Sequence, residues 1–221
     1  MWSRLIATMA CVVAIAAVVS LTWFALGYSL AFTPGWPWLG GTGRFWFAGF
    51  DYLKDAGTLA VSHVAPNVPE TVYAMFQLSF AIITTALVLG AFVERMRFSA
   101  MLIFCSLWLV LVYAPVCHWV WGGGWLGDMG LQDFAGGSVV HITAGVAALI
   151  AATSIGSRRG FGLTAMPPHN LTMTVTGAGM LWVGWFGFNA GSAVAADSSA
   201  AMAMLVTHLS AACGSLAWMT M

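Results

Sequence analysis

Residues 71–92 read TVYAMFQLSFAIITTALVLGAF, a run of 22 residues that contains no charged side chain. An α-helix needs about 20 mostly apolar residues to cross the hydrocarbon core of a bilayer, so this run is long enough to span a membrane. Its apolar residues are continuous, whereas the strands of a membrane β-barrel alternate apolar with polar residues. The run therefore predicts a transmembrane helix rather than a barrel strand.

The remainder of the chain repeats this pattern. The 221 residues are 61% hydrophobic and 6% charged, with a mean hydropathy of +0.90, whereas soluble domains contain about 25% charged residues. The sequence predicts an all-α integral membrane protein with about six transmembrane helices, forming a single membrane domain over residues 1–221. The other five helices are expected at about Leu5–Phe32, Phe98–Val120, Gly136–Ser154, Leu171–Ala190 and Ser199–Met221.

The charged residues indicate partners and orientation. Seven basic side chains balance seven acidic ones, so the chain has no positive field to bind nucleic acid. If the six helices alternate, Arg44 and Lys54 fall on one side of the membrane and five arginines on the other, which the positive-inside rule assigns to the cytoplasm. We therefore expect a multi-pass protein of the plasma (inner) membrane with both chain ends cytoplasmic and with residues 33–70 and 121–134 facing outward. The five arginines are Arg4, Arg95, Arg97, Arg158 and Arg159.

The two ends of the chain need separate interpretation. Arg4 precedes an apolar run, as in a signal peptide, but the run is long and no small-residue cleavage site follows it, which favours a transmembrane helix. The last run reaches Met221 without the basic or polar flank that usually anchors a final membrane helix. We expect the chain to be a fragment of a longer protein.

Motifs of soluble enzymes are absent from the sequence. It contains no P-loop, no GxGxxG opening a helix, no HExxH and no GxSxG. Four cysteines lack CxxC or CxxH spacing and are expected to be packing residues. The sequence predicts no enzyme, no cofactor and no metal site. These cysteines are Cys11, Cys105, Cys117 and Cys213.

Two polar residues, Asp133 and His141, lie beside or within an apolar run, where burying a polar group costs free energy. Asp133 precedes the run 136–154, where its carboxylate would accept hydrogen bonds from the first-turn amides and would also attract a cation from outside. His141 lies about two turns further along that run. It is either a hydrogen-bonded core residue or the lining of a narrow path among the small residues that follow it.

Aromatic residues gather near the expected outer face. The simpler interpretation is an aromatic belt at the membrane interface. Alternatively, a tryptophan face turned into a vestibule would attract a small cation. In the run 171–190, the glycines 184, 187 and 191 form a stripe for close helix packing. Phe188 would lie beside this stripe and either plug a passage or fill a gap. The tryptophans concerned are Trp36, Trp38, Trp119, Trp121 and Trp125.

Seven short motifs resemble those of the ammonium transporter (Amt/Mep/Rh) family, and Trp121 is similar to the Amt/Mep branch. The resemblance covers nearly the whole chain and is weakest in the loop 33–70. It implies the second to seventh of about eleven helices in two inverted halves, with truncation at both ends and no second pore histidine. The motifs are Gly27-Tyr-Ser-Leu-Ala-Phe32, Phe76-Gln77 with Phe80, Glu94-Arg-Met-Arg-Phe-Ser99, Val120-Trp-Gly-Gly-Gly-Trp125, Asp133-Phe-Ala-Gly-Gly-Ser-Val-Val-His141, Pro168-His-Asn170 and Gly187-Phe-Asn-Ala-Gly-Ser192.

The resemblance also implies roles for individual residues. In the family an ammonium ion docks in an outer vestibule, held by a tryptophan face and a serine hydroxyl to which Trp121 and Ser192 correspond. Two stacked phenylalanines, corresponding to Phe80 and Phe188, close the pore beneath the ion, and Phe80 also borders the vestibule. Further neighbours of the vestibule would be Phe76, Gln77 and Trp185.

The implied pore residues are Asp133 and His141. Asp133 matches a buried aspartate that the family needs for activity, and His141 matches the first pore histidine. Such a protein recruits NH4+ and passes NH3, with or without the proton, through a hydrophobic pore. The resemblance implies ammonium or ammonia and the lipid bilayer as partners, a homotrimer, and a cytoplasmic nitrogen-regulatory protein for the full-length parent.

Two other functions stay open on the sequence alone. A haem-binding membrane subunit of an oxidoreductase would use His118 and His141 as axial ligands. An ammonium sensor would resemble the same family, because some members report the ion rather than move it. A truncated chain by itself is expected to conduct nothing.

Overall fold

A computed structural model describes residues 2–53 and 58–221 and divides them into two units, residues 1–165 and residues 166–221. Each unit is described by itself. Lys54, counted above among the outward basic residues, lies outside the described residues. Within the described part of the chain, six helices are long and apolar enough to cross a membrane, which confirms the predicted number. They are Ala7–Phe32, Glu70–Phe92, Phe98–Asp128, Gly137–Ile155, Leu171–Ala193 and Ser198–Thr220.

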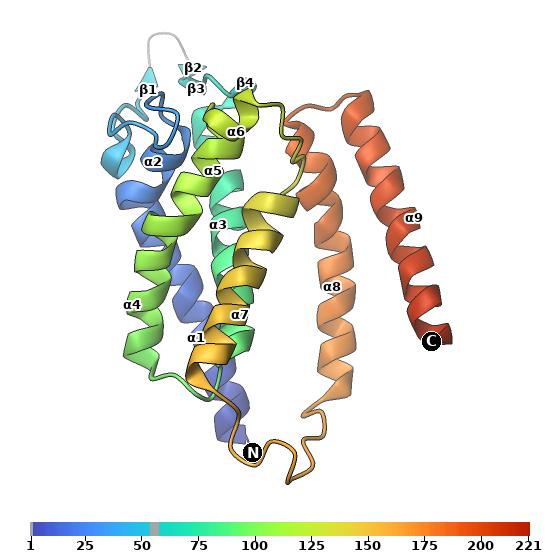
Figure 1. Cartoon of the computed structure of the whole chain (residues 1–221). Coiled ribbons are helices and arrows are strands. Elements are labelled where there is room, and N and C mark those ends of the chain that lie inside the picture. The colour runs from blue at the N-terminus through green and yellow to red at the C-terminus, as the bar shows by residue number, and fades with distance from the viewer. Residues whose placement is uncertain (1, 54–57) are drawn as a thin grey trace. The chain divides into compact units, whose positions relative to one another are not determined.

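Unit 1 is a bundle of four of these spans, three of which contain π-helical segments (Figure 1). A π segment inserts a residue into the regular helix, is often found at functional sites, and leaves no signature in the hydropathy pattern. The first span comprises α1 (Trp2–Thr22), η1 (Trp23–Gly27) and α2 (Tyr28–Phe32). The second span is α3 (Glu70–Phe92). The third comprises α4 (Phe98–Trp108), η3 (Leu109–Tyr113), α5 (Ala114–Trp121) and α6 (Trp125–Asp128). The fourth comprises η4 (Gly137–Ile142) and α7 (Thr143–Ile155).

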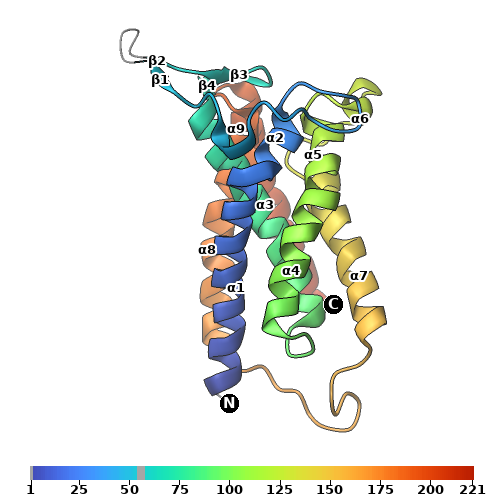
Figure 2. The same cartoon turned by 90° about the vertical axis from the view of Figure 1, so that its left-hand side faces the viewer.

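Helix α3 runs through the middle of unit 1 and packs against α1 and α7 (Figures 1 and 2). Its long apolar run is therefore buried on several sides, and the core of the unit is built around it. Trp23, in the π segment η1, is fully buried and donates its indole N–H to the carbonyl of Ala74 on α3 at 3.2 Å. The Trp23 ring also contacts Tyr113 of the second π segment, with centroids 6.2 Å apart. The two π segments thus meet in one aromatic core.

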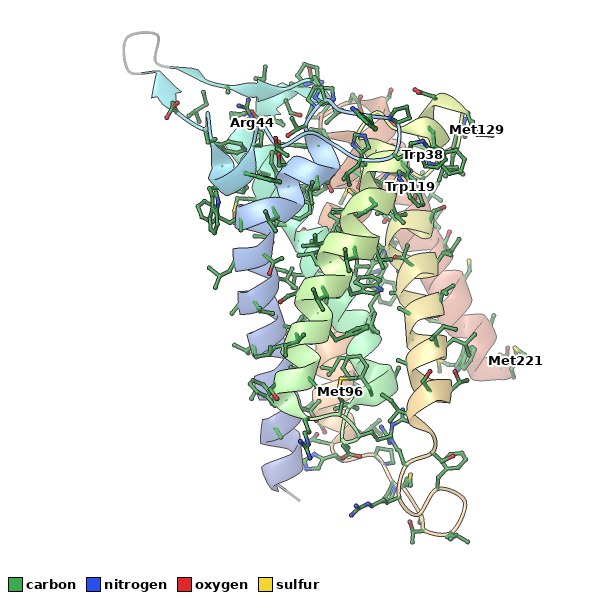
Figure 3. The ribbon with its side chains drawn as sticks, turned by 60° about the vertical axis from the view of Figure 1, so that its left-hand side comes forward. Trp38, Arg44, Met96, Trp119, Met129 and Met221 are labelled. Carbon is green, nitrogen blue, oxygen red and sulfur yellow. The ribbon has the colours of Figure 1, made fainter. Side chains whose placement is uncertain are left out.

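The long loop 33–69 folds over one end of unit 1. It contains a short helix η2 (Phe45–Phe47) and two antiparallel hairpins, β1 (Tyr52–Leu53) with β2 (Thr58–Leu59) and β3 (Val61–Ser62) with β4 (Ala65–Pro69). The hairpins lie at the same end as α6, whereas the N-terminus and the α3–α4 turn lie at the other end (Figure 2). Arg44 and Met96 mark these two ends (Figure 3).

Glu70, the first residue of α3, ties the loop to the bundle. Its carboxylate is only 4% exposed and accepts hydrogen bonds from Arg44 Nε at 3.1 Å, from Arg44 Nη2 at 2.9 Å and from Tyr28 Oη at 2.9 Å. The hydrogen bonds with Glu70 raise the pKa of Arg44 further above its already high usual value, so this guanidinium stays charged at any physiological pH. The hydropathy pattern alone did not predict this ion pair.

Unit 2 is a helical hairpin of α8 (Leu171–Asn189), the short helix η5 (Ala190–Ala193) and α9 (Ser198–Thr220). Both long helices have side-chain N-caps, a motif that satisfies an otherwise unpaired amide. Asn170 Oδ1 accepts from Met173 N, and Asp197 Oδ1 accepts from Ala200 N, each at 2.9 Å. No residue of these two helices is buried within the chain.

Candidate functional site

The candidate site begins at Trp121, the last residue of α5. Its indole N–H donates to the backbone carbonyl of Asp133 at 2.6 Å, which fixes the ring. The ring packs edge-on against Phe80 of α3, with centroids 5.6 Å apart and planes at 87°. Phe80 in turn contacts Phe76, one helical turn away, at 4.9 Å. Unit 1 therefore brings three of the predicted site residues into one contiguous aromatic set.

The other tryptophans of this region form a separate cluster. Trp38, Trp119 and Trp125 contact one another with ring centroids 5.0–6.2 Å apart, and Trp119 donates its indole N–H to the Trp38 carbonyl at 2.7 Å. Trp38 and Trp119 lie together beside Met129 (Figure 3), and Trp36 is largely exposed. These residues fit an interfacial belt, whereas Trp121 faces Phe80. The structure thus groups three of these tryptophans together and pairs Trp121 with Phe80.

Gln77 adds a polar group next to this aromatic set. It lies on α3 beside Phe76, is 6% exposed, and donates from Nε2 to the Tyr73 hydroxyl at 3.2 Å. Its carbonyl oxygen Oε1 is buried and has no hydrogen-bond partner among the described residues. A buried acceptor of this kind is uncommon and costs free energy unless a donor reaches it. The site therefore offers an acceptor for an N–H group.

Asp133 is a cap for the turn that leads into η4 and α7. Oδ1 accepts from the amides of Gly136 and Gly137, and Oδ2 accepts from those of Ser138 and Val139, all between 2.7 and 2.9 Å. An ionised carboxylate has about four acceptor sites, so these four amides occupy it fully. Asp133 thus shapes the backbone rather than coordinating a cation directly. Its charge still contributes to the potential at this end of the helix.

His141 lies in η4, close to the Asp133 turn. Its Nδ1 is 3.0 Å from the carbonyl oxygen of Gly136, which in the neutral ring makes Nδ1 the donor and Nε2 the acceptor. Gly136 has a φ of 100°, and a Cβ there would lie 2.5 Å from Cγ2 of Val140. This position needs glycine on both grounds. Asp133, Gly136 and His141 thus belong to one hydrogen-bonded turn.

Three predicted site residues lie in unit 2. Trp185 and Phe188 stack with centroids 5.0 Å apart and planes at 29°. Ser192, in η5, donates its hydroxyl proton to the backbone carbonyl of Phe188 at 2.7 Å, and its oxygen keeps lone pairs for accepting a hydrogen bond. The predicted residues are therefore grouped as two sets, one within each unit.

His118 is a buried residue that sequence reasoning considered only as a haem ligand. Its two ring nitrogens lie 2.9 Å from the carbonyl oxygen of Ala31 and 2.8 Å from that of Trp36. Both nitrogens are thus engaged by the backbone, which argues against axial coordination of haem iron. Among the residues that the structure describes, no group of three or more His, Cys, Asp or Glu side chains is placed to hold a metal ion.

The architecture defines the class of protein: a multi-pass membrane protein of six apolar helices. The model of the Ammonium Transporter Family matches residues 3–221. The chain belongs to the ammonium transporter family, whose members are transporters rather than enzymes.

Individual relatives agree with this assignment. An ammonium transporter of Bacillus subtilis is 48% identical over 202 residues, which cover 91% of this chain and 48% of the relative. A putative ammonium transporter of Methanothermobacter thermautotrophicus is 49% identical over 204 residues, which cover 92% of this chain and 48% of the relative. The chain spans about half the length of these relatives.

Solved structures also share the fold. The crystal structure of Candida albicans Mep2 matches with a TM-score of 0.83 and 36% identity, over 93% of this chain and 45% of that one. A structure described as a sensor Amt protein matches with a TM-score of 0.75 and 28% identity, over 90% of this chain and 49% of that one. The chain thus has the Amt fold and forms a fragment of the larger transporter architecture.

Proposed function

We propose that this chain, as part of a protein of its relatives' length, transports ammonium across the membrane. The observation that carries the proposal is the aromatic set of Trp121, Phe80 and Phe76 in a chain that belongs to the ammonium transporter family. This set combines a fixed tryptophan face with buried rings beneath it. The relatives named above as ammonium transporters support the substrate.

Ammonium is recruited in an outer vestibule formed around Trp121 and Ser192. The face of a tryptophan ring attracts a small cation by about 0.5–2 kcal/mol, and the serine oxygen accepts one N–H bond. Gln77 and Trp185 line the same vestibule, with the buried Oε1 of Gln77 as a further acceptor. An ion with four N–H donors and one positive charge suits this combination of acceptors and ring faces.

Phe80 and Phe188 form a gate between the vestibule and the pore. Phe80 is 1% exposed and packed between Phe76 and Trp121. A bare cation in a hydrophobic passage costs several kcal/mol or more, so the ion gives up its proton and NH3 enters the narrow section. His141, whose Nδ1 lies 3.0 Å from the carbonyl oxygen of Gly136, lines this section. Potassium has no proton to release and is excluded.

The assembly and orientation belong to the same proposal. The protein is a homotrimer in the plasma (inner) membrane, with both ends of this chain on the cytoplasmic side. In unit 1 the N-terminus and the α3–α4 turn, which carries Arg95 and Arg97, lie at one end and Arg44 at the other (Figures 2 and 3), which supports this orientation under the positive-inside rule. The 221 residues act as one membrane domain, and the full-length protein contacts a cytoplasmic nitrogen-regulatory protein.

An ammonium sensor is the second candidate function. The match to a sensor Amt protein favours it, although at 28% identity it lies further from this chain than the 48% of the Bacillus transporter. A sensor would bind ammonium at the same vestibule and transport little of it. Binding without uptake therefore separates the two functions.

The first measurement is the length of the native protein, by mass spectrometry of membrane extracts from its own cell. Peptides upstream of residue 1 or beyond residue 221 identify the full protein, which is then reconstituted into liposomes. Uptake of labelled methylammonium that is lost in Trp121→Ala and in His141→Ala supports transport. Equal uptake by liposomes with and without the protein would refute it, and saturable ammonium binding without uptake would indicate the sensor.

A further inference from the structure

His208 lies in the middle of the last membrane span. Helix α9 runs from Ser198 to Thr220, so at 1.5 Å per residue His208 lies about 15 Å from its first residue and about 18 Å from its last. Residues 198–220 include no Asp, Glu, Lys or Arg. The hydrocarbon core of a bilayer is about 30 Å thick, so an imidazole at this depth is too short to reach the water at either interface.

The imidazole of His208 packs on two aromatic rings of α8. Its centroid is 5.7 Å from that of Trp182 and 5.9 Å from that of Phe186, one helical turn further along. The neighbouring polar side chains of the hairpin satisfy each other, because Asn189 Nδ2 donates to Thr207 Oγ1 at 2.9 Å. The hairpin therefore holds the ring by packing, and its own polar pair lies beside the ring.

The nitrogens of this ring have no hydrogen-bond partner in the part of the chain that the structure describes, and the His208 side chain is exposed. An apolar side chain can face lipid at no cost, whereas a polar group without a partner in hydrocarbon costs free energy. We propose that His208 forms a hydrogen bond with an uncharged polar side chain on another membrane helix of the same protein, outside these 221 residues.

Small residues on the same face of α9 permit such a contact. Ala201, Ala212 and Ser215 lie one or two turns from His208, on its side of the helix. Ala201 and Ser215 are exposed, and Ala212 is half-buried. In membranes, small residues let two helix backbones approach closely, and polar side chains such as histidine then bond across the contact. The His208 face thus combines a polar group with room for a close neighbour.

The chemistry of the partner follows from the ring. A neutral imidazole has one N–H donor and one lone pair, and a Ser, Thr, Asn or Gln side chain can meet either of them. Such a side chain also costs less to bury than a charged one. The chain covers 48% of the Bacillus subtilis transporter, so a protein of that length contains a second half that can supply this helix. This step rests on the proposed function, under which the chain is part of such a protein.

The sign of a stability change tests the hydrogen bond. In the full-length protein in lipid nanodiscs, His208→Leu removes both nitrogens and is expected to lower the midpoint of thermal unfolding by about 1–4 °C, as for the loss of one interhelical hydrogen bond. His208→Asn keeps a donor and an acceptor and is expected to recover at least about half of this loss. For a histidine that faces lipid, leucine is the more favourable residue. An unchanged or higher midpoint in His208→Leu therefore overturns the proposal.

Ser210→Leu is the matched control. Ser210 is exposed on the opposite side of α9, two residues from His208 and at nearly the same depth. Its replacement also exchanges a polar side chain for leucine, and the unfolding midpoint is expected to stay within about 1 °C. An equal loss in Ser210→Leu and His208→Leu would show that the lower polarity of α9 is responsible, and would overturn the proposal.

Photo-cross-linking identifies the partner. Benzoylphenylalanine is placed at position 208 of the full-length protein, the membranes are irradiated, and the joined peptides are sequenced by mass spectrometry. We expect a cross-link within one copy, to a peptide outside residues 1–221. A cross-link to residues 1–165, a cross-link to a second copy or cross-linking to lipid alone overturns the assignment of the partner.

Both tests are independent of transport. A full-length protein that takes up no methylammonium refutes the proposed function as a transporter, yet its unfolding midpoints and cross-links still decide on His208. Conversely, normal uptake together with a stabilising His208→Leu substitution refutes this inference alone.

Discussion

The predicted site residues fall in two regions, one in each unit, and these regions are held in place very differently. In unit 1, Trp121 is fixed by its own hydrogen bond to Asp133 and by the ring of Phe80. The ring of His118, one turn earlier on α5, contacts the carbonyl oxygens of Ala31 and Trp36. In unit 2, Ser192 has a hydrogen bond to the preceding turn, and no residue of α8 or α9 is buried within the chain. The first half of the site is therefore organised by this chain itself. The helices of the second half are held within their unit by their contacts with each other and with η5.

The largest expected effect is a loss of unfolding free energy when a helix cap is removed, and it is expected to differ between Asp133 in unit 1 and Asp197 in unit 2. Asp133→Ala removes the acceptor of four amides in unit 1, whereas Asp197→Ala removes that of one amide in unit 2. An unsatisfied buried amide costs about 1–3 kcal/mol. Three of the four amides are part-buried and that of Gly137 is exposed, so the first variant is expected to lose about 2–4 kcal/mol of unfolding free energy. The second is expected to lose about 1 kcal/mol. Denaturant unfolding of the full-length protein in detergent measures both, and equal losses would contradict the comparison.

The second largest loss of stability is expected when the Arg44–Glu70 ion pair is broken. Glu70→Gln leaves Arg44 without its carboxylate and is expected to lower the unfolding free energy by about 1–3 kcal/mol, less than for a fully buried pair because Arg44 is about one third exposed. The exposed Glu94→Gln is the matched control and is expected to change it by less than about 0.5 kcal/mol. The same unfolding measurement applies. Identical stability of Glu70→Gln and the control would show that the loop is anchored by other contacts.

A binding effect is expected at Trp121. Trp121→Leu retains an apolar side chain but loses the ring face, so the half-saturating concentration for methylammonium is expected to rise about 2- to 30-fold, as for the loss of one cation–π contact. Trp119→Leu, in the separate tryptophan cluster, is expected to leave it within about twofold. Uptake by proteoliposomes measures both variants. A larger effect of Trp119→Leu would indicate that the ion binds at the cluster of Trp38, Trp119 and Trp125 instead.

The smallest expected effect lies in unit 2. Ser192→Ala removes one neutral acceptor from the proposed vestibule and one hydrogen bond to Phe188. The half-saturating concentration is expected to rise about two- to tenfold, because a single neutral hydrogen bond contributes about 0.5–1.5 kcal/mol. Thr207→Val, which removes the acceptor of Asn189 elsewhere in the hairpin, is the control. If Ser192→Ala exceeded Trp121→Leu, the second half of the site would carry most of the recognition.

The sequence predicted the membrane spans well because bilayer thickness determines them. All six predicted runs contain helices whose ends differ by a few residues, with α6 extending the third span to Asp128. The expected capping role of Asp133 is also confirmed by its four amide bonds. Both features depend on residues close together in the sequence.

Features that depend on distant residues were not predicted. The π segment at Trp23 meets Ala74 and Tyr113, and hydropathy carries no information about such contacts. The Arg44–Glu70 pair joins residues 26 apart, and the contacts of the His118 ring with the Ala31 and Trp36 carbonyls join residues more than 80 apart. The resemblance to a family named the pore residues, but it did not indicate what holds Trp121 in place.

Arg95 has a consequence for movement within the membrane. Its guanidinium donates to the carbonyls of Ala91 and Gly156, which joins the ends of α3 and α7 opposite the hairpins. Near the middle of α3, Phe80 meets Trp121, whose indole is bonded to the Asp133 turn that precedes η4 and α7. The two helices are thus connected at two levels of the bundle. Sliding of one helix past the other would break both connections, so the two helices are expected to move as one body.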